Sequence, residues 1–122
     1  MIAHCLRALP LEGCGLLVGD ASNGRIASVA ATPNAAASAK VYAIDPGEHL
    51  RIDRSARSHG EDVIGAFHSH THTDAWPSPT DVASAVDDSW HWVIVSLRAA
   101  SPIVRSFRIR AGEIEEEPIV LH

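Results

Sequence analysis

Apolar runs of strand length, separated by turn residues, are the feature that most constrains how this chain can fold. Short runs rich in valine, isoleucine and alternating apolar residues are typical of β-strands. They predict strands at residues 14–18, 25–32, 41–44, 62–70, 90–97, 103–110 and 113–121. A β-sheet is therefore expected at the centre of the fold.

Two segments between the predicted strands begin with a helix-capping residue that is followed by proline. Asp45 precedes Pro46, and Ser78 precedes Pro79, which is the usual order of an N-cap and a first helical residue. Helices are predicted at residues 46 to about 58 and 79 to about 86, after a first helix at residues 2–9. Helices placed between strands predict a mixed α/β fold around a single sheet.

The length of 122 residues predicts one domain, residues 1–122, and 46% apolar with 20% charged residues is ordinary for a globular protein. No apolar run approaches the length of a membrane span, and the first residues lack the features of a signal peptide. Cys5 and Cys14 are too few for a disulfide framework and are interpreted as reduced thiols. These features predict a cytoplasmic protein without a membrane partner.

The charge balance argues against a nucleic-acid partner. Fifteen acidic residues outweigh ten basic ones, for a formal net charge of −5, whereas nucleic-acid binding usually needs a basic stripe that neutralises phosphates. The arginines of this chain are scattered instead. The unusual number in the composition is that of histidine, at eight.

Two histidines at the end of a predicted strand form the centre of a candidate metal site. Residues two apart on a strand project from the same face, so His68 and His70 can direct both imidazoles at one point while Ser69 turns away. A catalytic zinc ion typically has three protein ligands from His, Asp or Glu and one open position. Asp81, in the first turn of the helix that follows the loop, is the predicted third ligand.

A hydrolase built on such a metal also needs a general base and a donor for the oxyanion. The candidate base is Glu12, which precedes the apolar strand at residues 14–18, and that strand can lie beside the histidine strand. Ser78 lies three residues before Asp81, close enough for its hydroxyl to be the donor. The pattern predicts a zinc-dependent hydrolase, although the same ligand types also suit iron or cobalt.

Each of these residues also has a simpler interpretation. Ser78 and Asp81 ahead of an apolar helix resemble a capping pair, and Glu12 alone would be an ordinary surface carboxylate. His72 and Asp74 are alternative ligands by type, but they fall in the flexible part of the loop. The joint pattern favours the metal site. The remaining histidines are interpreted as ordinary surface or core residues, namely His4, His49, His59, His91 and His122.

Together these residues resemble the JAMM (MPN+) metalloprotease pattern of a glutamate, His-Ser-His, seven residues, Ser, two residues and Asp. The matching positions are Glu12, His68-Ser69-His70, Ser78 and Asp81, within a chain that is similar to the family over nearly its whole length. The resemblance implies that His68, His70 and Asp81 bind one zinc ion. It implies that Glu12 is the general base and that Ser78 stabilises the tetrahedral intermediate. It also implies a single curved mixed sheet flanked by helices, similar to the cytidine-deaminase arrangement.

Within the family, the chain resembles small bacterial members that act on ubiquitin-like sulfur carrier proteins. The features behind this resemblance are Thr71 after the second histidine and residues 75–78, 80–82, 95–98 and 105–109. Such enzymes release a cysteine built on the C-terminal diglycine tail of the carrier. The resemblance therefore implies a peptidase in cysteine biosynthesis whose partner is a sulfur carrier.

Three features depart from the family pattern. Thr71 replaces the proline that commonly follows His-Ser-His and is expected to loosen the start of the loop, whereas Gly13 replaces the usual alanine without an expected consequence. Family members usually have a strand before the first helix, whereas this chain begins inside that helix. Either the start site has been assigned late or the sheet lacks an N-terminal edge strand, which bears on stability and oligomer contacts and not on the site.

Two other functions stay open at this point. An isopeptidase or deubiquitinase-like enzyme would use the same site on another ubiquitin-like conjugate. A non-catalytic MPN scaffold would lack one or more of the ligands or the glutamate, and this chain lacks none of them. Trp76, beside Ser78, either lines the substrate groove or packs against the fold.

Overall fold

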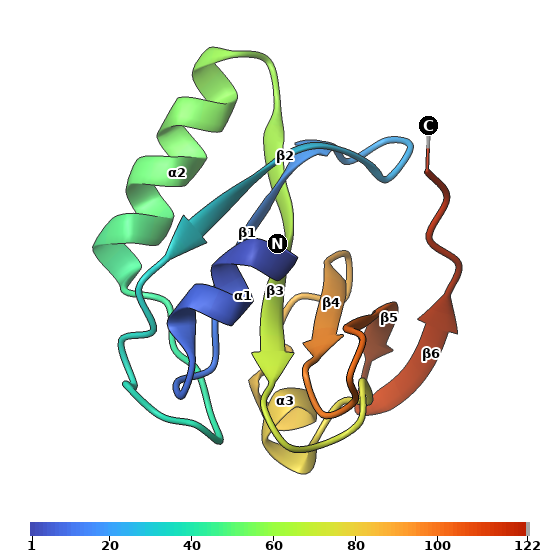
Figure 1. The fold of residues 1–122 in the computed structure, drawn as a ribbon. Coiled ribbons are helices and arrows are strands. Elements are labelled where there is room, and N and C mark those ends of the chain that lie inside the picture. The colour runs from blue at the N-terminus through green and yellow to red at the C-terminus, as the bar shows by residue number, and fades with distance from the viewer. Residues whose placement is uncertain (122) are drawn as a thin grey trace.

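A mixed β-sheet with three helices makes up the described part of the chain, residues 1–121 of this computed structural model (Figure 1). The elements in chain order are α1 (Ile2–Ala8), β1 (Cys14–Asp20), β2 (Arg25–Thr32), α2 (Pro46–Ser58), β3 (Asp62–His70), α3 (Pro79–Ser84), β4 (His91–Ser96), β5 (Ile103–Arg110) and β6 (Glu113–Glu117). The order of strands across the sheet is β2-β1-β3-β4-β5-β6. Neighbouring strands are antiparallel except β3 and β4, which are parallel. The predicted fold class, a single mixed sheet flanked by helices, is confirmed.

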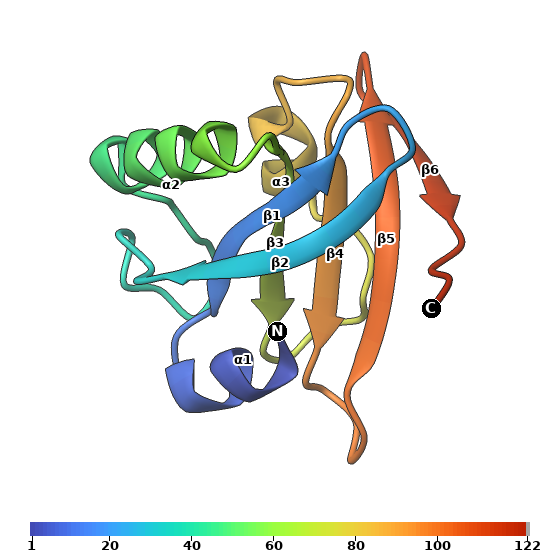
Figure 2. The ribbon, with the colours of Figure 1, turned by 90° about the horizontal axis from the view of Figure 1, so that it is seen from above.

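The two faces of the sheet carry separate apolar clusters beneath different helices. Figure 2 shows α2 and α3 on one side of the sheet and α1 on the other. Leu16 packs in one cluster with Ile52 of α2, whereas the next residue, Leu17, packs in the other with Cys5 of α1. Successive side chains of a strand point to opposite faces, so β1 contributes to both clusters. The sheet is consequently buried on both sides at its centre.

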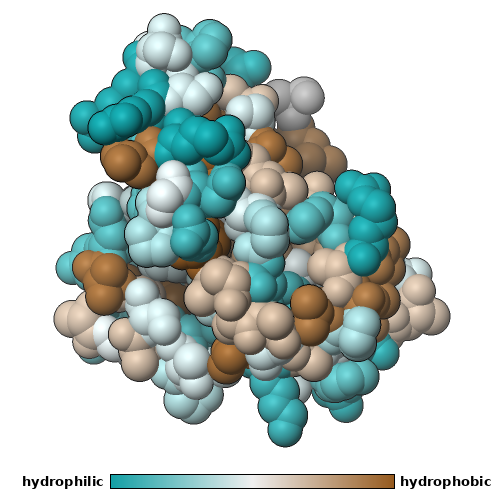
Figure 3. Space-filling view, turned by 90° about the vertical axis from the view of Figure 1, so that its left-hand side faces the viewer, coloured by the Kyte–Doolittle hydropathy of each residue, from teal (hydrophilic) through white to brown (hydrophobic). Residues whose placement is uncertain are grey.

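Helix α2 begins where the sequence predicts. The Asp45 carboxylate accepts a hydrogen bond from the Glu48 backbone N–H at 3.1 Å, and this interaction caps the first turn. The helix buries Ile52 and Ala56 and turns its other side outward. Hydrophilic residues accordingly dominate the upper part of the face in Figure 3, where α2 lies. No helix within residues 1–121 is long and apolar enough to cross a membrane.

The predicted strand at residues 41–44 is wrong, because the Asn34 side chain takes the place of a strand partner. Its amide nitrogen donates to the Val41 carbonyl at 3.0 Å, and its oxygen accepts from the Ala43 N–H at 3.0 Å. The same amide nitrogen donates to the carbonyls of Glu12 and Ser38. We call residues 34–44 the Asn34 loop.

Two elements end two or more residues before the predicted boundary. Helix α3 ends at Ser84 and not near residue 86, and the N–H of its C-cap, Ala85, bonds to the Val82 carbonyl. Strand β6 ends at Glu117, directly before Pro118, which has no N–H to donate to a neighbouring strand.

Candidate metal centre and active site

Strand β3 directs its two histidines to the face of the sheet that α2 and α3 cover. Ala66 belongs to the cluster on that face, and His68 and His70 follow it at steps of two residues. Both histidines are buried, with 2% and 4% of their surface exposed. They lie at the end of the strand, beside the loop that leads to α3.

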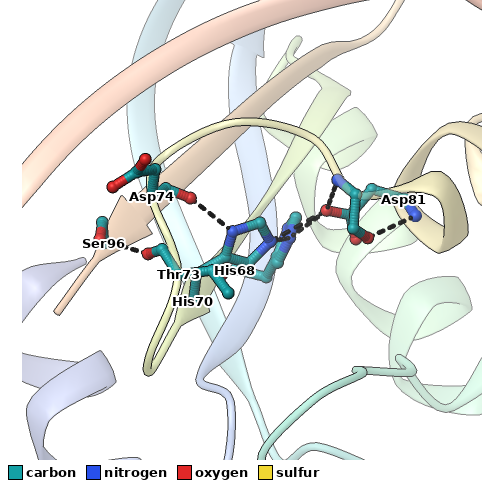
Figure 4. A network of polar contacts seen from close by, with 7 residues as sticks. His68, His70, Thr73, Asp74, Asp81 and Ser96 are labelled. Atoms are coloured by element: carbon teal, nitrogen blue, oxygen red, sulfur yellow. Dashed lines mark hydrogen bonds and ion pairs between the residues drawn. The ribbon is translucent and has the colours of Figure 1, made fainter. Parts of the chain in front are cut away.

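Asp81 joins the two histidines from the first turn of α3 (Figure 4). Its Oδ2 atom lies 3.2 Å from His68 Nε2 and 2.9 Å from His70 Nε2, and the two Nε2 atoms are 3.1 Å apart. Among residues 1–121 this is the one group of three histidine, cysteine or acidic side chains whose donor atoms converge closely enough to hold a metal ion. The structure therefore brings together all three predicted ligands.

The start of α3 fixes the position of the Asp81 carboxylate. Ser78 is the N-cap, and its hydroxyl oxygen accepts from the Asp81 N–H at 3.1 Å. In return the Ser78 N–H donates to Asp81 Oδ2 at 2.9 Å, which completes a capping box. The capping interpretation is thus realised in the structure. It uses only a lone pair of the hydroxyl and leaves the O–H of Ser78 available as a donor.

The loop after β3 orients the His70 ring through its backbone. The Asp74 carbonyl accepts from His70 Nδ1 at 2.8 Å, so Nε2 is the atom turned toward Asp81 (Figure 4). The Asp74 carboxylate is exposed and pairs with Arg98 at 2.8 Å, and the His72 side chain is also exposed. Neither alternative ligand, His72 or Asp74, belongs to the convergent group.

Tyr42 holds the His68 ring and was not singled out from the sequence. The two rings are stacked with centroids 4.3 Å apart and an angle of 17° between their planes. His68 Nδ1 is buried and has no hydrogen-bond partner within residues 1–121. Stacking on Tyr42 therefore orients this ring together with the contact of its Nε2 atom to Asp81. No sequence signal identified Tyr42, because its position depends on the Asn34 loop.

Glu12 reaches the same site from the segment before β1. Cys14 is paired with His68 across the antiparallel strands β1 and β3. When this register is continued by two residues beyond the pair, Glu12 lies opposite His70. Ser69, on the other face of β3, fixes this segment, because its hydroxyl accepts from the Gly13 N–H at 2.8 Å. The expectation that β1 lies beside the histidine strand is confirmed.

The Glu12 carboxyl is buried, with 3% of the residue exposed, and its Oε1 atom has no hydrogen-bond partner within residues 1–121. Burial raises the pKa of Glu12 to about 7, an effect that the nearby His70 opposes and Asp81 reinforces. A carboxyl whose pKa lies near neutrality can both accept and release a proton at physiological pH.

The three converging side chains have shifted pKa values of their own. Burial alone would raise the pKa of Asp81, but hydrogen bonds from His68 and His70 hold it well below its ordinary range. Burial lowers the pKa of His68. Burial also opposes the charged form of His70, but the bonds to Asp81 and to the Asp74 carbonyl, together with the charges of Asp81 and Glu12, outweigh it and raise the pKa of His70. An ionised carboxylate beside a neutral imidazole is the form in which both groups can ligate a metal.

Several predicted positions outside this group also have clear locations. Trp76 is 48% exposed and packs edge-on against Phe107, with centroids 5.2 Å apart, so it combines packing with exposure beside α3.

Gly13 has a consequence that the sequence did not indicate. A Cβ at this position would lie 2.8 Å from Cys5 Cα, so glycine allows α1 to approach the sheet closely. His122 lies outside the described residues.

The sequence profile described as prokaryotic homologs of the JAB domain matches residues 1–110. The chain belongs to this JAB-domain family. The match covers the segment of Glu12 and all three converging side chains. The predicted family, JAMM (MPN+), is thereby confirmed.

The named relatives of this JAB-domain chain include a peptidase, a desampylase and a conjugate-cleaving protease. The CysO-cysteine peptidase of Mycobacterium tuberculosis is 38% identical over 98% of this chain and 82% of its own length. The desampylase of Haloferax volcanii is 35% identical over 71% of this chain and 63% of its own. A probable TtuB-protein conjugate cleaving protease of Thermus thermophilus is 30% identical over 91% and 70%. The chain is accordingly a JAMM-type hydrolase.

Solved structures agree with the JAB-domain assignment. A protein from Desulfitobacterium hafniense is 36% identical and has a TM-score of 0.91 over 100% of this chain and 86% of its own. A JAB1/MPN domain protein from Archaeoglobus fulgidus is 19% identical, with a TM-score of 0.59 over 94% of this chain and 85% of its own, and supports the fold alone.

Proposed function

We propose that this chain is a zinc-dependent peptidase that hydrolyses the C-terminal tail of a ubiquitin-like sulfur carrier and releases cysteine from a carrier–cysteine adduct. The observation that carries the proposal is the convergence of His68, His70 and Asp81 on one point beside the buried carboxyl of Glu12. The similarity to a CysO-cysteine peptidase over 98% of the chain supports the choice of substrate. We place the reaction in the cytoplasm, where thiols such as the free Cys5 and Cys14 stay reduced.

The donor atoms fit zinc in number, type and spacing. Tetrahedral ligands at about 2.0–2.1 Å from a zinc ion stand about 3.3 Å from one another. The separations among His68 Nε2, His70 Nε2 and Asp81 Oδ2 are 2.9 to 3.2 Å, close to that value. The Asp74 carbonyl, which accepts from His70 Nδ1, is a usual outer partner of a ligating histidine.

The remaining side chains provide the proton transfers and the oxyanion contact. When bound, zinc supplies a Lewis acid that activates water and polarises the scissile carbonyl. Glu12 accepts a proton from the attacking water and passes it to the leaving amine, a role that its pKa of about 7 suits. The free O–H of Ser78 donates to the oxyanion that develops on the attacked carbonyl. The amine leaves as the α-amino group of cysteine.

A second candidate function is cleavage of an isopeptide bond between a ubiquitin-like protein and a target lysine. The relatives from Haloferax volcanii and Thermus thermophilus favour it, because their names describe desampylation and conjugate cleavage. The same residues would carry that reaction, so the two functions differ only in the leaving amine. A non-catalytic scaffold is disfavoured because no residue of the pattern is missing.

The first test is the intact mass of a carrier extended by cysteine after incubation with the zinc-loaded protein. Loss of one cysteine residue is expected. Glu12→Gln should retain stoichiometric zinc, because the ligands stay in place, and lose about 10²- to 10⁴-fold in turnover. His68→Ala should lose both zinc and turnover.

Two results would contradict this assignment. Full activity of Glu12→Gln would exclude Glu12 as the general base. An unchanged carrier, with zinc measured in the protein, would exclude the cysteine adduct as substrate. A lysine-linked conjugate of the same carrier, tested in parallel, then distinguishes the second candidate function from an inactive protein.

A further inference from the structure

The Glu12 carboxyl lies at the site without a hydrogen bond that fixes its Oε1 atom. The residue is buried, and Oε1 has no partner within residues 1–121. Glu12 also precedes β1, whose pairing with β3 begins at Cys14. The position of the carboxyl therefore depends on how the backbone of Glu12 is held.

The Asn34 loop holds both polar groups of that backbone. The Glu12 N–H donates to the Ser38 carbonyl at 2.8 Å, and the Glu12 carbonyl accepts from Asn34 Nδ2 at 3.1 Å. The same Nδ2 atom donates to the Ser38 carbonyl at 3.2 Å, so one side-chain amide joins the acceptor of the Glu12 N–H to the Glu12 carbonyl. Because the backbone groups of a buried residue need such partners, these bonds fix Glu12 against the loop.

The remaining bonds of the Asn34 side chain close the loop on itself. Its Oδ1 atom accepts from the N–H groups of Ala36 and Ala43, each at 3.0 Å. Residues 34–44 form neither a helix nor a strand, so these side-chain bonds do much to define the shape of the loop. None of the hydrogen bonds of Asn34 within residues 1–121 goes to a proposed metal ligand. Asn34 therefore contacts the segment of the base and not the ligands.

We propose that Asn34 is a positioning residue for catalysis, which sets the place of the Glu12 carboxyl through the Glu12 backbone. The proposal rests on the function proposed above, in which Glu12 is the general base. Proton transfer needs the base within hydrogen-bond reach of the attacking water, and a misplacement of about 1 Å can cost about 10²-fold in rate. Without the Asn34 amide, the carbonyls of Glu12 and Ser38 lose their common donor. The base then loses its fixed position while the metal ligands keep theirs.

The test is a double-mutant cycle with Glu12→Gln. In the otherwise unaltered, zinc-loaded chain, Asn34→Ala should lower kcat on the cysteine-extended carrier by about 10- to 100-fold, with KM and zinc stoichiometry nearly unchanged. In the Glu12→Gln background it should change kcat by less than about twofold, because the group that it positions is already absent. A residue that only stabilises the fold would lower kcat equally in both backgrounds. Intact mass after long incubation and metal analysis provide the measurements.

The matched control is Asn23→Ala, which removes the same side chain from the turn between β1 and β2, at the end of β1 opposite to Glu12. It should leave kcat unchanged in both backgrounds. Asn34→Asp is the second variant, for the case in which Asn34→Ala does not fold. It keeps an oxygen that accepts from Ala36 and Ala43 but has no donor for Glu12, so it should give the same pattern as Asn34→Ala.

Three results would overturn the inference and leave the peptidase function standing. The first is an unchanged kcat in Asn34→Ala, and the second is an equal loss of kcat in both backgrounds. The third is loss of zinc in Asn34→Ala, because the loop would then act on the ligands through Tyr42, whose ring stacks on His68. Failure of the zinc-loaded, unaltered chain to cleave the carrier would overturn the proposed function together with this inference.

Discussion

At the scale of single residues, the two histidines of the centre are held by different kinds of contact. His70 donates Nδ1–H to a backbone carbonyl, as ligating histidines commonly do. His68 lacks such a bond within residues 1–121 and stacks on Tyr42 instead. Its orientation therefore depends on a flat side chain from a loop far away in the sequence.

Replacing Tyr42 by leucine should weaken zinc binding by about tenfold or more, within the range measured for outer partners of metal ligands. Tyr42→Phe keeps the stacked ring and should bind zinc with nearly unchanged affinity. The affinity is measured by competition with a chromogenic chelator. Equal weakening in both variants would show that the hydroxyl matters and not the stacking.

At the scale of elements, β3 contributes functional and structural side chains to both faces of the sheet. His68 and His70 form the centre on one face, while Ser69 and the neighbouring Phe67 face α1 on the other. Ser69 bonds to Gly13, and this bond holds the segment of Glu12 in register. One strand thus carries two of the proposed metal ligands and secures the segment that carries the proposed base.

Gly13→Ala tests how closely α1 must approach that segment. The new Cβ would lie 2.8 Å from Cys5 Cα, so the helix must move, at a cost of about 1–3 kcal/mol of unfolding free energy. The shift should also expose Cys5, which is fully buried, to a thiol reagent. Urea unfolding and labelling followed by peptide mass analysis measure the two effects. Cys14, buried in β1, is the internal control, and equal labelling of both cysteines would indicate general loosening and not a shift of α1.

The sequence was informative about elements wherever local rules decide. Asp45 and Ser78 cap their helices as predicted, and every strand except the one at residues 41–44 forms. That segment failed because the side chain of Asn34, seven to nine residues earlier, bonds to its backbone. Periodicity contains no information about such a contact.

In the candidate site, too, the features set by local rules were predictable and those set by contacts between distant segments were not. His68, His70 and Asp81 were predictable because a strand and a helix start place them at fixed offsets. The stacking of Tyr42 and the isolation of the Glu12 carboxyl were not, because both depend on how distant segments pack.

At the scale of the whole molecule, the buried Glu12 carboxyl reduces stability as the pH rises in the absence of metal. Glu12 has a pKa of about 7 in the folded chain, against an ordinary value of 4.5. Below pH 4.5 both the folded and the unfolded chain keep the proton. As the pH rises from 4.5 to 7 the unfolded chain releases it first, so the free energy of unfolding falls. Above pH 7 the loss is complete and amounts to about 3 kcal/mol for this shift.

Glu12→Gln should abolish that loss. In metal-free protein, its free energy of unfolding relative to the unaltered chain should rise by up to about 3 kcal/mol between pH 4.5 and pH 8. Urea unfolding at both pH values measures the difference. A difference that does not change with pH would mean that the folded Glu12 ionises as it does in the unfolded chain.

The arrangement of the site also depends on the chemical stability of one side-chain amide, that of Asn34. Its NH₂ group donates to three carbonyl oxygens, of Glu12, Ser38 and Val41. Spontaneous deamidation would turn this group into a carboxylate oxygen that faces the same three oxygens and repels them. Glu12 and the backbone on both sides of Tyr42 would lose a common support at once. Ageing of this single side chain would therefore loosen the surroundings of the site without any change in the proposed metal ligands.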